Sequence, residues 1–303
     1  MTSATSLSRR NLLKAGAVAS AAVLVPAVSA SAASTHPQVS GTEHRFRALE
    51  QKYGARLGVY AHNIHTGRVV TYRPHERFAM CSTFKSVAAG ALLRDHDCSA
   101  PLDKVIRYRR RDLVANSPIT EQHVDDGMTV GELCAAAIRY SDNTAGNLLL
   151  RQIGGPEGLT RFFRSLGDPV SRLDRWETDL NTAIPGDLRD TTTPAAMGRS
   201  YETLTLGPAL STADRRQLVT WLQGNTTSAK RFRAGLPKDW IVADKTGTGD
   251  YASANDIGVT WTTERTPIVL TVLSSKPAKD APVDDEMIAD AARLLAHTLA
   301  PGE

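Results

Sequence analysis

Ser82 and Lys85 form the only Ser-x-x-Lys sequence in this chain of 303 residues. Residues three apart lie on the same face of a helix, so the lysine amine would stand beside the serine hydroxyl. A serine hydroxyl attacks a carbonyl group readily only when a neighbouring group takes its proton. The spacing therefore predicts covalent catalysis with Ser82 as the nucleophile and Lys85 as a candidate base.

Three further short sequences downstream carry groups that suit the same chemistry. Each is common by itself, because Ser-Asp-Asn is typical of a helix cap or turn and Lys-Thr-Gly of an exposed turn. In this order and spacing, the four stretches resemble the class A serine β-lactamases. The three downstream stretches are Ser141-Asp142-Asn143, Glu177-Thr178-Asp179-Leu180-Asn181 and Lys245-Thr246-Gly247.

The resemblance implies hydrolysis of the β-lactam amide of penicillins and cephalosporins through an acyl-enzyme on Ser82. It makes Ser141 the proton relay to the leaving nitrogen and Asn143 an amide donor to the substrate side chain. Glu177, with Asn181, would hold and activate the water that removes the acyl group. Lys85 could take the serine proton if its surroundings lowered its pKa. Glu177, acting through a water, is the other candidate, and the sequence leaves this choice open.

The same resemblance assigns substrate contacts to the last stretch. Lys245 would supply a positive charge for the substrate carboxylate, next to Thr246. Gly247 would leave room for a backbone to lie against the ligand. The backbone N–H of Thr248 would be the second oxyanion donor, beside that of Ser82.

Two positions depart from the commoner family pattern. Many members have an arginine behind the carboxylate site where this chain has Ala254. Arg231 matches an alternative position from which other members reach that site, and it could equally belong to a basic surface stretch. Asn116 stands where many members carry an aromatic residue at the entrance, a departure that bears on the substrate profile and not on the reaction.

The chain has three cysteines, Cys81, Cys98 and Cys134. An odd number does not suggest a disulfide framework. The positions that would pair with Cys134 and Cys81 in some members of the family hold Ala89 and Gly249. We therefore expect three buried free thiols, and we expect Cys81 to be a small core side chain although it directly precedes Ser82.

The elements that must position these residues follow from periodicity and turn residues. A loop with close ends, an Ω-loop, is expected at 175–190, with Arg175 and Asp190 pairing across its neck by family resemblance. A capped helix should begin at Thr129 and bury Leu133, Ala136, Ala137 and Tyr140. A helix after Ser82 should bury one face, formed by Phe84, Val87, Ala88, Leu92 and Leu93. Other expected helices are 44–53, 143–153, 158–166, 211–221 and 285–299, and expected strands are 56–62, 69–72, 240–244, 253–261 and 268–274.

Strands at both ends of the chain with helices between them predict an α/β (α+β) fold. We expect a five-stranded, mainly antiparallel sheet flanked by terminal helices, an all-helical part, and the active site at their junction. The expected domains are a discontinuous sheet domain (41–75 and 225–303) and a helical domain (76–224) that includes the Ω-loop.

The composition is that of a globular enzyme, with 41% hydrophobic and 22% charged residues. Three of the 36 basic residues (Arg9, Arg10, Lys14) lie in an N-terminal leader without acidic residues, which leaves 33 basic against 32 acidic side chains. This balance does not favour a nucleic-acid partner. The eight histidines are scattered and no His-Glu-x-x-His sequence occurs, so we expect neither a metal nor another cofactor.

Residues 1–32 have the form of an export signal. Arg9 and Arg10 resemble a twin-arginine motif, and the apolar segment 15–28 is too short to span a membrane. Small residues before positions 31 and 33 offer two cleavage sites. The sequence predicts an exported monomer that acts on a small β-lactam, with no stable membrane association after the signal is removed.

Two other functions share Ser-x-x-Lys and Lys-Thr-Gly. One is a D,D-peptidase or transpeptidase that acts on cell-wall peptides, and the other is a β-lactam sensor that stays acylated. The resemblance separates them by Glu177 and Asn181, which peptidases of that group lack. Their presence favours the hydrolase.

Overall fold

The structure is a computed structural model that describes residues 37–95 and 101–303. The export signal predicted at 1–32 and Cys98 lie outside the described residues. Residues Pro37–Glu303 cluster into one compact unit. The division of this unit into a sheet domain and a helical domain stays a prediction.

One sheet gathers five strands from both ends of the unit, in the order β2-β1-β9-β8-β7. Every neighbouring pair is antiparallel, which confirms the predicted sheet. The predicted hairpin near the N-terminal end is also present. The five strands are β1 (Arg56–Asn63), β2 (Val69–Tyr72), β7 (Ile241–Gly249), β8 (Ser253–Trp261) and β9 (Pro267–Ser275).

The predicted end of β7 at Asp244 is wrong. Lys245 to Gly249 continue the strand, because they pair in register with Ile257 to Ser253 of β8. Lys-Thr-Gly therefore forms part of the edge strand of the sheet and not a turn. This placement gives the backbone of residues 245–249 a fixed position.

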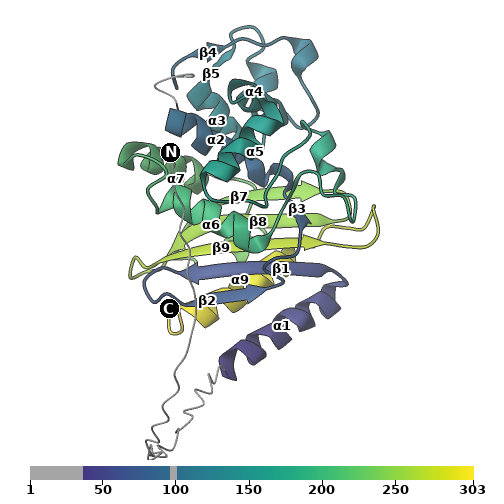
Figure 1. Cartoon of the computed structure of the whole chain (residues 1–303), viewed down its shortest axis with the longest axis vertical. Coiled ribbons are helices and arrows are strands. Elements are labelled where there is room, and N and C mark those ends of the chain that lie inside the picture. The colour runs from purple at the N-terminus through teal and green to yellow at the C-terminus, as the bar shows by residue number, and fades with distance from the viewer. Residues whose placement is uncertain (1–36, 96–100) are drawn as a thin grey trace, which may run out of the picture. The chain divides into compact units, whose positions relative to one another are not determined.

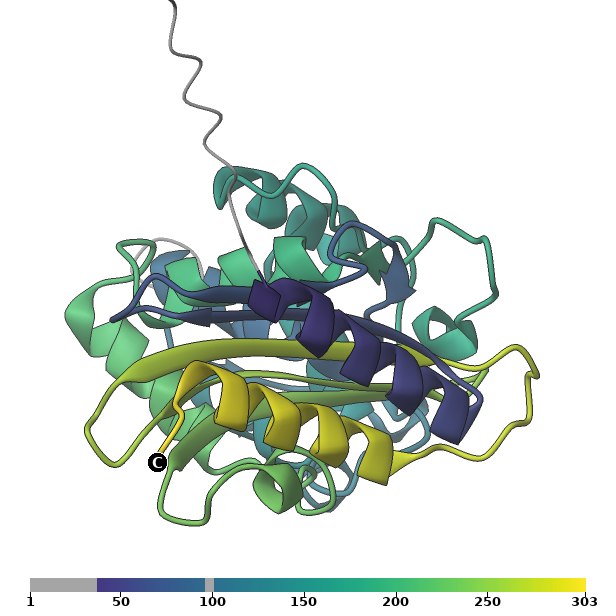
Figure 2. The ribbon, with the colours of Figure 1, turned by 90° about the horizontal axis from the view of Figure 1, so that it is seen from below.

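Two terminal helices cover one face of the sheet. These helices, α1 (Pro37–Tyr53) and α9 (Asp285–Leu299), lie side by side beneath the strands (Figures 1 and 2). Their apolar side chains join the inward residues of β1 and β9 in one core, which includes Phe46, Val272 and Ile288. The predicted C-terminal helix is confirmed at both ends, and α1 begins seven residues earlier than predicted.

The other face of the sheet carries α6, and helices α2 to α5 and α7 pack beyond it and beside β7 (Figure 1). The sequence did not single out α6 or the short α8 (Phe232–Gly235), which packs against α9. The larger helices of this part are α2 (Phe84–Asp95), α3 (Val130–Arg139), α4 (Asn143–Gln152), α5 (Gly155–Ser165), α6 (Pro194–Thr205) and α7 (Thr212–Gln223).

Short elements connect these helices. The short strands are β3 (Phe78–Ala79), β4 (Val105–Ile106), β5 (Met128–Thr129) and β6 (Thr191–Thr192), and the 3-10 turns are η1 (Cys81–Thr83), η2 (Arg110–Asp112), η3 (Thr120–Gln122) and η4 (Asp179–Thr182). Strands β3 and β6 pair with each other next to the site described below.

The helix after Ser82 differs from its prediction. The sequence predicted one buried face, whereas all residues from Phe84 to Leu93 are buried. Helix α2 packs against α3, α4, α5 and α7, so no side faces solvent. Small residues such as Ala89 and Gly90 on its other faces let these neighbours approach closely.

Helix α3 begins as predicted. The Thr129 hydroxyl accepts from the backbone N–H of Glu132, and the Glu132 carboxylate accepts from the backbone N–H of Thr129, which forms a capping box. Leu133, Ala136 and Ala137 are buried. Tyr140 is 43% exposed, so its predicted burial is wrong. It follows the last residue of α3 and so leaves the buried stripe.

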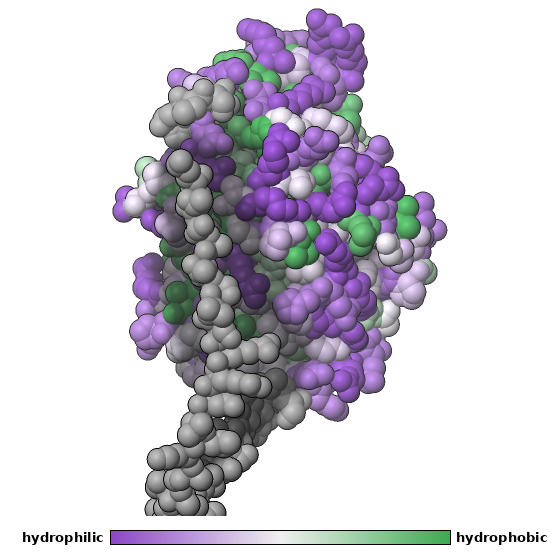
Figure 3. Space-filling model, in the orientation of Figure 1, coloured by the Kyte–Doolittle hydropathy of each residue, from purple (hydrophilic) through white to green (hydrophobic). Residues whose placement is uncertain are grey.

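The surface seen in Figure 3 is mostly hydrophilic, with hydrophobic residues in small separate groups. None of the helices in the described residues is long and apolar enough to cross a membrane.

Candidate active site

Ser82 lies in η1, a single turn that runs directly into α2. The preceding residue, Cys81, has a φ of 47°, in the left-handed region. Ser82 is 7% exposed, so its hydroxyl sits in a recess and not on an open surface. The thiol of Cys81 is fully buried, and burial raises its pKa to about 12. A thiol that resists ionisation is a poor nucleophile, and the burial of Cys81 agrees with its expected place as a small core side chain.

Four oxygen atoms surround the amine of Lys85. Its Nζ donates to Ser82 Oγ at 3.0 Å, to the carbonyl of Ser141 at 2.8 Å and to Asn143 Oδ1 at 2.6 Å. It also pairs with Glu177 Oε1 at 2.9 Å, and neither side chain of this ion pair is exposed. Burial lowers the pKa of Lys85, while the carboxylate of Glu177 opposes the shift.

Glu177 faces the nucleophile from the Ω-loop. Its Oε1 accepts from the hydroxyl of Ser82 at 3.3 Å, and its Oε2 accepts from Asn181 Nδ2 at 2.5 Å. Asn181 Oδ1 is buried and has no hydrogen-bond partner among the described residues. The carboxylate therefore contacts the hydroxyl of Ser82, and the side chain bonded to that carboxylate carries a free amide oxygen.

Asn147 holds the backbone of Glu177 from both sides, and the sequence analysis missed this residue. Its Oδ1 accepts from the N–H of Glu177 at 2.9 Å, and its Nδ2 donates to the carbonyl of Glu177 at 3.0 Å. Asn147 lies on α4, one turn after Asn143, so the two amides share one helix face. This four-residue spacing from Asn143 was the one feature of the sequence that could have pointed to Asn147 as a site residue.

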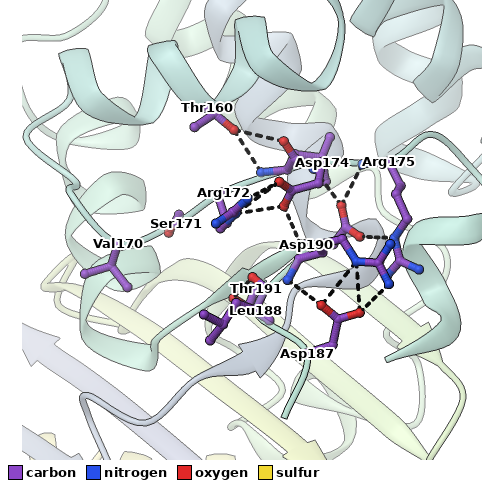
Figure 4. A network of polar contacts seen from close by, with 12 residues as sticks. Thr160, Val170, Ser171, Arg172, Asp174, Arg175, Asp187, Leu188, Asp190 and Thr191 are labelled. Carbon is purple, nitrogen blue, oxygen red and sulfur yellow. Dashed lines mark hydrogen bonds and ion pairs between the residues drawn. The ribbon is translucent and has the colours of Figure 1, made fainter. Parts of the chain in front are cut away.

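The neck of the Ω-loop is closed by the pair that the resemblance implied (Figure 4). Arg175 Nε donates to Asp190 Oδ2 at 2.6 Å. Asp190 Oδ1 accepts from the backbone N–H groups of Asp174 and Arg175, and Asp174 Oδ2 accepts from the N–H of Asp190. Arg172 pairs with Asp174 in turn. Because Asp190 is fully buried, this network fixes the loop that carries Glu177.

Ser141 and Lys245 meet on the other side of the nucleophile. Lys245 Nζ donates to Ser141 Oγ at 3.1 Å and to the carbonyl of Thr246 at 2.8 Å. Burial lowers the pKa of Lys245 to about 7, and the positive charge of Lys85 adds to the shift. Asp142 has the structural role expected of it: it caps α4 and accepts from the N–H groups of Ile119 and Thr120.

Gly247 has a packing role that the sequence did not predict. A Cβ atom there would lie 2.9 Å from the carbonyl oxygen of Met80 and 3.2 Å from Cβ of Cys81. The missing side chain therefore lets β7 pack against the turn that carries Ser82, and the expected contact with a ligand stays a prediction. Thr248 follows at the edge of the sheet and is exposed.

Arg231 lies behind β7 and is 5% exposed, so the interpretation as a surface residue is wrong. Its Nη1 donates to the carbonyls of Gly247 and Asn255, and its Nη2 donates to Thr248 Oγ1, all at 2.8 Å. Its Nε pairs with Asp285 at 2.7 Å. These contacts aim the guanidinium group at the strand that holds Thr248.

Asn255 ties the sheet to the nucleophile, and it too was missed. From β8, its Nδ2 donates to the carbonyl of Ala79 at 2.9 Å and to that of Met80 at 3.3 Å. The hydroxyl of Thr83 donates to the same Met80 carbonyl at 2.7 Å. Asn255 is fully buried. It therefore sets the position of the segment that leads into Ser82.

Two buried carboxyl groups lie on one face of β7 and β8, Asp244 and Asp256. Asp244 Oδ1 accepts from Asn225 Nδ2 at 3.0 Å, and Asp256 Oδ2 accepts from the N–H of Phe232 at 3.1 Å. The other oxygen of each has no hydrogen-bond partner among the described residues. Burial raises the pKa of both groups, and the proximity of Asp244 adds to the shift of Asp256.

The arrangement suits acyl transfer. It has a nucleophile with a base within hydrogen-bond reach, a second hydroxyl beside a cation, and an edge strand next to the nucleophile.

Asn116 is exposed, with a φ of 60°, and its carbonyl accepts from the N–H of Asn143. Ala254, in contrast, is a residue of β8 whose side chain is buried in the core that α1 and α9 share with the sheet. Within residues 37–95 and 101–303, no group of three or more His, Cys, Asp or Glu side chains is placed to hold a metal ion.

Comparison with known proteins gives two family matches. A family model described as the beta-lactamase enzyme family matches residues 41–299. A second model, for signal sequences of the twin-arginine translocation pathway, matches residues 6–26.

Individual relatives agree with the family match. The chain is 52% identical over 298 residues to the beta-lactamase AST-1 of Nocardia asteroides, covering 96% of each. It is 53% identical over 256 residues to the carbapenem-hydrolyzing beta-lactamase KPC of Klebsiella oxytoca, covering 84% of this chain and 87% of that one. The solved beta-lactamase of Streptomyces albus G superposes with a TM-score of 0.84 at 53% identity, covering 86% of this chain and 100% of that one. An ancestral class A beta-lactamase, GNCA4, gives a TM-score of 0.83 at 54% identity, covering 85% and 99%.

Proposed function

This chain belongs to the beta-lactamase enzyme family, and we propose that it hydrolyses β-lactams through an ester formed on Ser82. The observation that carries this mechanism is the position of Glu177. Its carboxylate contacts both the hydroxyl of Ser82 and the amine of Lys85, and Asn181 holds its other oxygen. A serine with a buried base at this distance can form an ester and can also have it removed by water.

In the first step the oxygen of Ser82 attacks the lactam carbonyl, and its proton goes to Glu177. The hydrogen bonds support this direction, since Ser82 Oγ donates to Glu177 while Lys85 donates to Ser82. Lys85, held among four oxygen acceptors, stays positively charged next to the carboxylate and stabilises negative charge on the serine oxygen.

The tetrahedral intermediate needs donors for its oxyanion. The backbone N–H groups of Ser82 and Thr248 are the candidates, because η1 packs directly against the edge strand β7. The C–N bond then breaks, and the nitrogen takes a proton from the hydroxyl of Ser141, which Lys245 reprotonates. Glu177 releases the serine proton to solvent and solvent returns one proton to Lys245, so both groups are back in their starting states before the second step. Lys245, which donates to that hydroxyl, supports this transfer and attracts the substrate carboxylate.

The second step removes the acyl group. We assign the water that attacks the ester to Glu177 and Asn181 Oδ1. Glu177 takes a proton from this water, the water oxygen adds to the ester carbonyl, and the ester bond breaks to regenerate the hydroxyl of Ser82. This step separates a hydrolase from a peptidase or a sensor that stays acylated.

The protein is exported, since its leader matches twin-arginine signal sequences at residues 6–26. We propose further that it works as a monomer on a small β-lactam substrate, without a nucleic-acid partner. The nearly equal numbers of basic and acidic side chains after the leader argue against a nucleic-acid partner.

The test is turnover of a chromogenic cephalosporin by the purified protein. We expect steady hydrolysis over many equivalents, and none by the Ser82→Ala variant. A stoichiometric burst that stops would instead support a penicillin-binding peptidase or a sensor.

A further inference from the structure

A cavity of about 120 Å³ lies between the outer part of the Ω-loop and the sheet. Residues 183–187 and Arg189 of the loop form one wall. The facing wall is formed by the first residue of β1 (Arg56), both residues of β3, the first residue of β8 (Ser253) and the last residue of β9 (Ser275). The cavity therefore sits where the Ω-loop meets strand ends that are far apart in the sequence.

Three arginines line this cavity, and their guanidinium groups differ in their partners. Arg56 pairs with Glu76 at 3.0 Å, and Arg189 pairs with Asp187 at 2.7 Å. Arg77 forms no ion pair with any described residue. Its Nη1 donates to the carbonyl of Val170 and to Thr191 Oγ1, whereas its Nε and Nη2 have no partner in the described chain. Arg77 is half-buried and thus carries a positive charge without a counter-charge.

Hydroxyl groups complete the lining. Ser253 and Ser275 border the cavity, and neither hydroxyl makes a hydrogen bond to the described residues. Asp187 is the one carboxylate of the lining, and Arg189 holds it with contacts of 2.7 and 3.0 Å. The unused groups are therefore donors: the free N–H groups of Arg77 and two serine hydroxyls. Such a set suits an oxyanion, which has acceptors only.

The size of the cavity limits the ligand. A water takes about 30 Å³ in the liquid, so the space holds roughly four waters or one tetrahedral oxyanion. We propose that this cavity binds a small tetrahedral oxyanion, inorganic phosphate or sulfate, and that the ion joins the Ω-loop to the sheet.

The position explains what binding would do. Ala79 lines the cavity and pairs with Thr191 across β3 and β6. The next residue, Met80, donates its N–H to the carbonyl of Asp190 at the loop neck. An ion between these elements adds contacts present only in the folded protein, so it stabilises the folded state by mass action.

The experiment measures the thermal midpoint Tm while phosphate or sulfate replaces chloride at constant ionic strength. We expect a rise of about 2–4 °C that saturates with concentration. The variant Arg77→Gln removes the unpaired charge and should lose the saturable rise. The variant Arg216→Gln makes the same change on the exposed side of α7 and should keep it.

General exclusion of sulfate from protein surfaces also raises Tm, but it does not saturate at low concentration. A rise that is linear and equal in all three proteins would therefore overturn the proposal. Isothermal titration of phosphate into the unmodified protein gives a second measurement that does not depend on whether a variant folds. Saturable heat with phosphate, weakened about tenfold or more in Arg77→Gln, is expected. The absence of saturable heat with both phosphate and sulfate would refute the site.

Discussion

The backbone N–H of Met80 donates to the carbonyl of Asp190 at 2.9 Å. Met80 belongs to the turn that carries the nucleophile, and Asp190 closes the neck of the loop that carries Glu177. Ser82 and Glu177 thus come from two segments about a hundred residues apart, and these segments are hydrogen-bonded to each other through Met80 and Asp190. A shift of either segment changes the distance between Ser82 and Glu177. Residues that hold these segments in place should therefore affect catalysis without touching substrate.

Asn255 is the clearest such positioning residue. Asn255→Ala removes both side-chain hydrogen bonds to Ala79 and Met80, and leaves their buried carbonyls with fewer partners. We expect the acylation rate constant to fall roughly tenfold, which corresponds to about 1.4 kcal/mol. The deacylation rate constant should change much less, and pre-steady-state kinetics can separate the two.

The matched control is Asn225→Ala, which removes a buried amide that contacts Asp244 but not the nucleophile turn. It should reduce stability without a selective loss of acylation. Equal effects of the two variants on acylation would show that Asn255 has only a general structural role.

Arg231→Ala should raise KM mainly for substrates that bear a carboxylate. A charge-assisted contact contributes roughly 1.5–3 kcal/mol, or about 10- to 150-fold in affinity. The neighbouring Arg233 contacts Ser228 and Asp244 and gives a control with the same change of charge. If Arg231→Ala alters no KM, the carboxylate is held by Lys245 and hydroxyl groups alone.

The low pKa of Lys245, about 7, predicts a pH dependence. The amine is charged below this pH and neutral above it, so attraction of a substrate carboxylate weakens as pH rises. In the free enzyme kcat/KM should therefore fall on the alkaline side. The guanidinium group in Lys245→Arg stays charged above pH 12, so the alkaline fall of kcat/KM should move to higher pH. If this fall stays at the same pH, the titrating group is not Lys245.

Asp256→Asn should stabilise the protein. The pKa of Asp256 is raised in the folded state, so wild-type stability falls as pH rises above the unfolded value near 4. The variant lacks this penalty, and its advantage in free energy of unfolding should be larger at pH 8 than at pH 5, reaching roughly 1–3 kcal/mol. Urea unfolding at the two pH values measures it.

Asp142→Asn is the contrasting variant, because both carboxylate oxygens of Asp142 accept hydrogen bonds. It should be destabilised by a similar amount. A loss of stability in Asp256→Asn as well would show that the buried carboxylate is compensated by its cationic neighbours.

Local patterns in the sequence were enough to predict much of this structure. The hairpin, the capped start at Thr129 and the C-terminal helix follow from short-range periodicity and turn residues. The four stretches that carry the family resemblance were found by their order and spacing. Lys-Thr-Gly was not expected within a strand, because Gly and Thr are also typical of turns and the pairing partner lies further along the chain.

The supporting asparagines had no local signature. Asn147 bonds to a residue 30 positions away, and Asn255 to one 176 positions away. Such contacts depend on the tertiary fold, which no short window of sequence contains. The full burial of α2 escaped prediction for the same reason, since its alanines and glycine carry no signal of what packs against them.

The central claim is that Glu177 directs water onto a Ser82 ester, and intact mass after incubation with penicillin tests it most directly. Without Glu177, the amine of Lys85 still lies 3.0 Å from Ser82 Oγ, so a base for the serine proton remains and the ester can still form. A positioned general base contributes about 10²–10⁴-fold, so deacylation should slow by that factor.

Asp179→Ala changes an exposed acid on the same loop and should turn over normally. We predict that Glu177→Ala accumulates a stoichiometric adduct on Ser82 while turnover collapses, and that Ser82→Ala gives no adduct. Turnover by Glu177→Ala at the wild-type rate, with no accumulated adduct, would contradict the account.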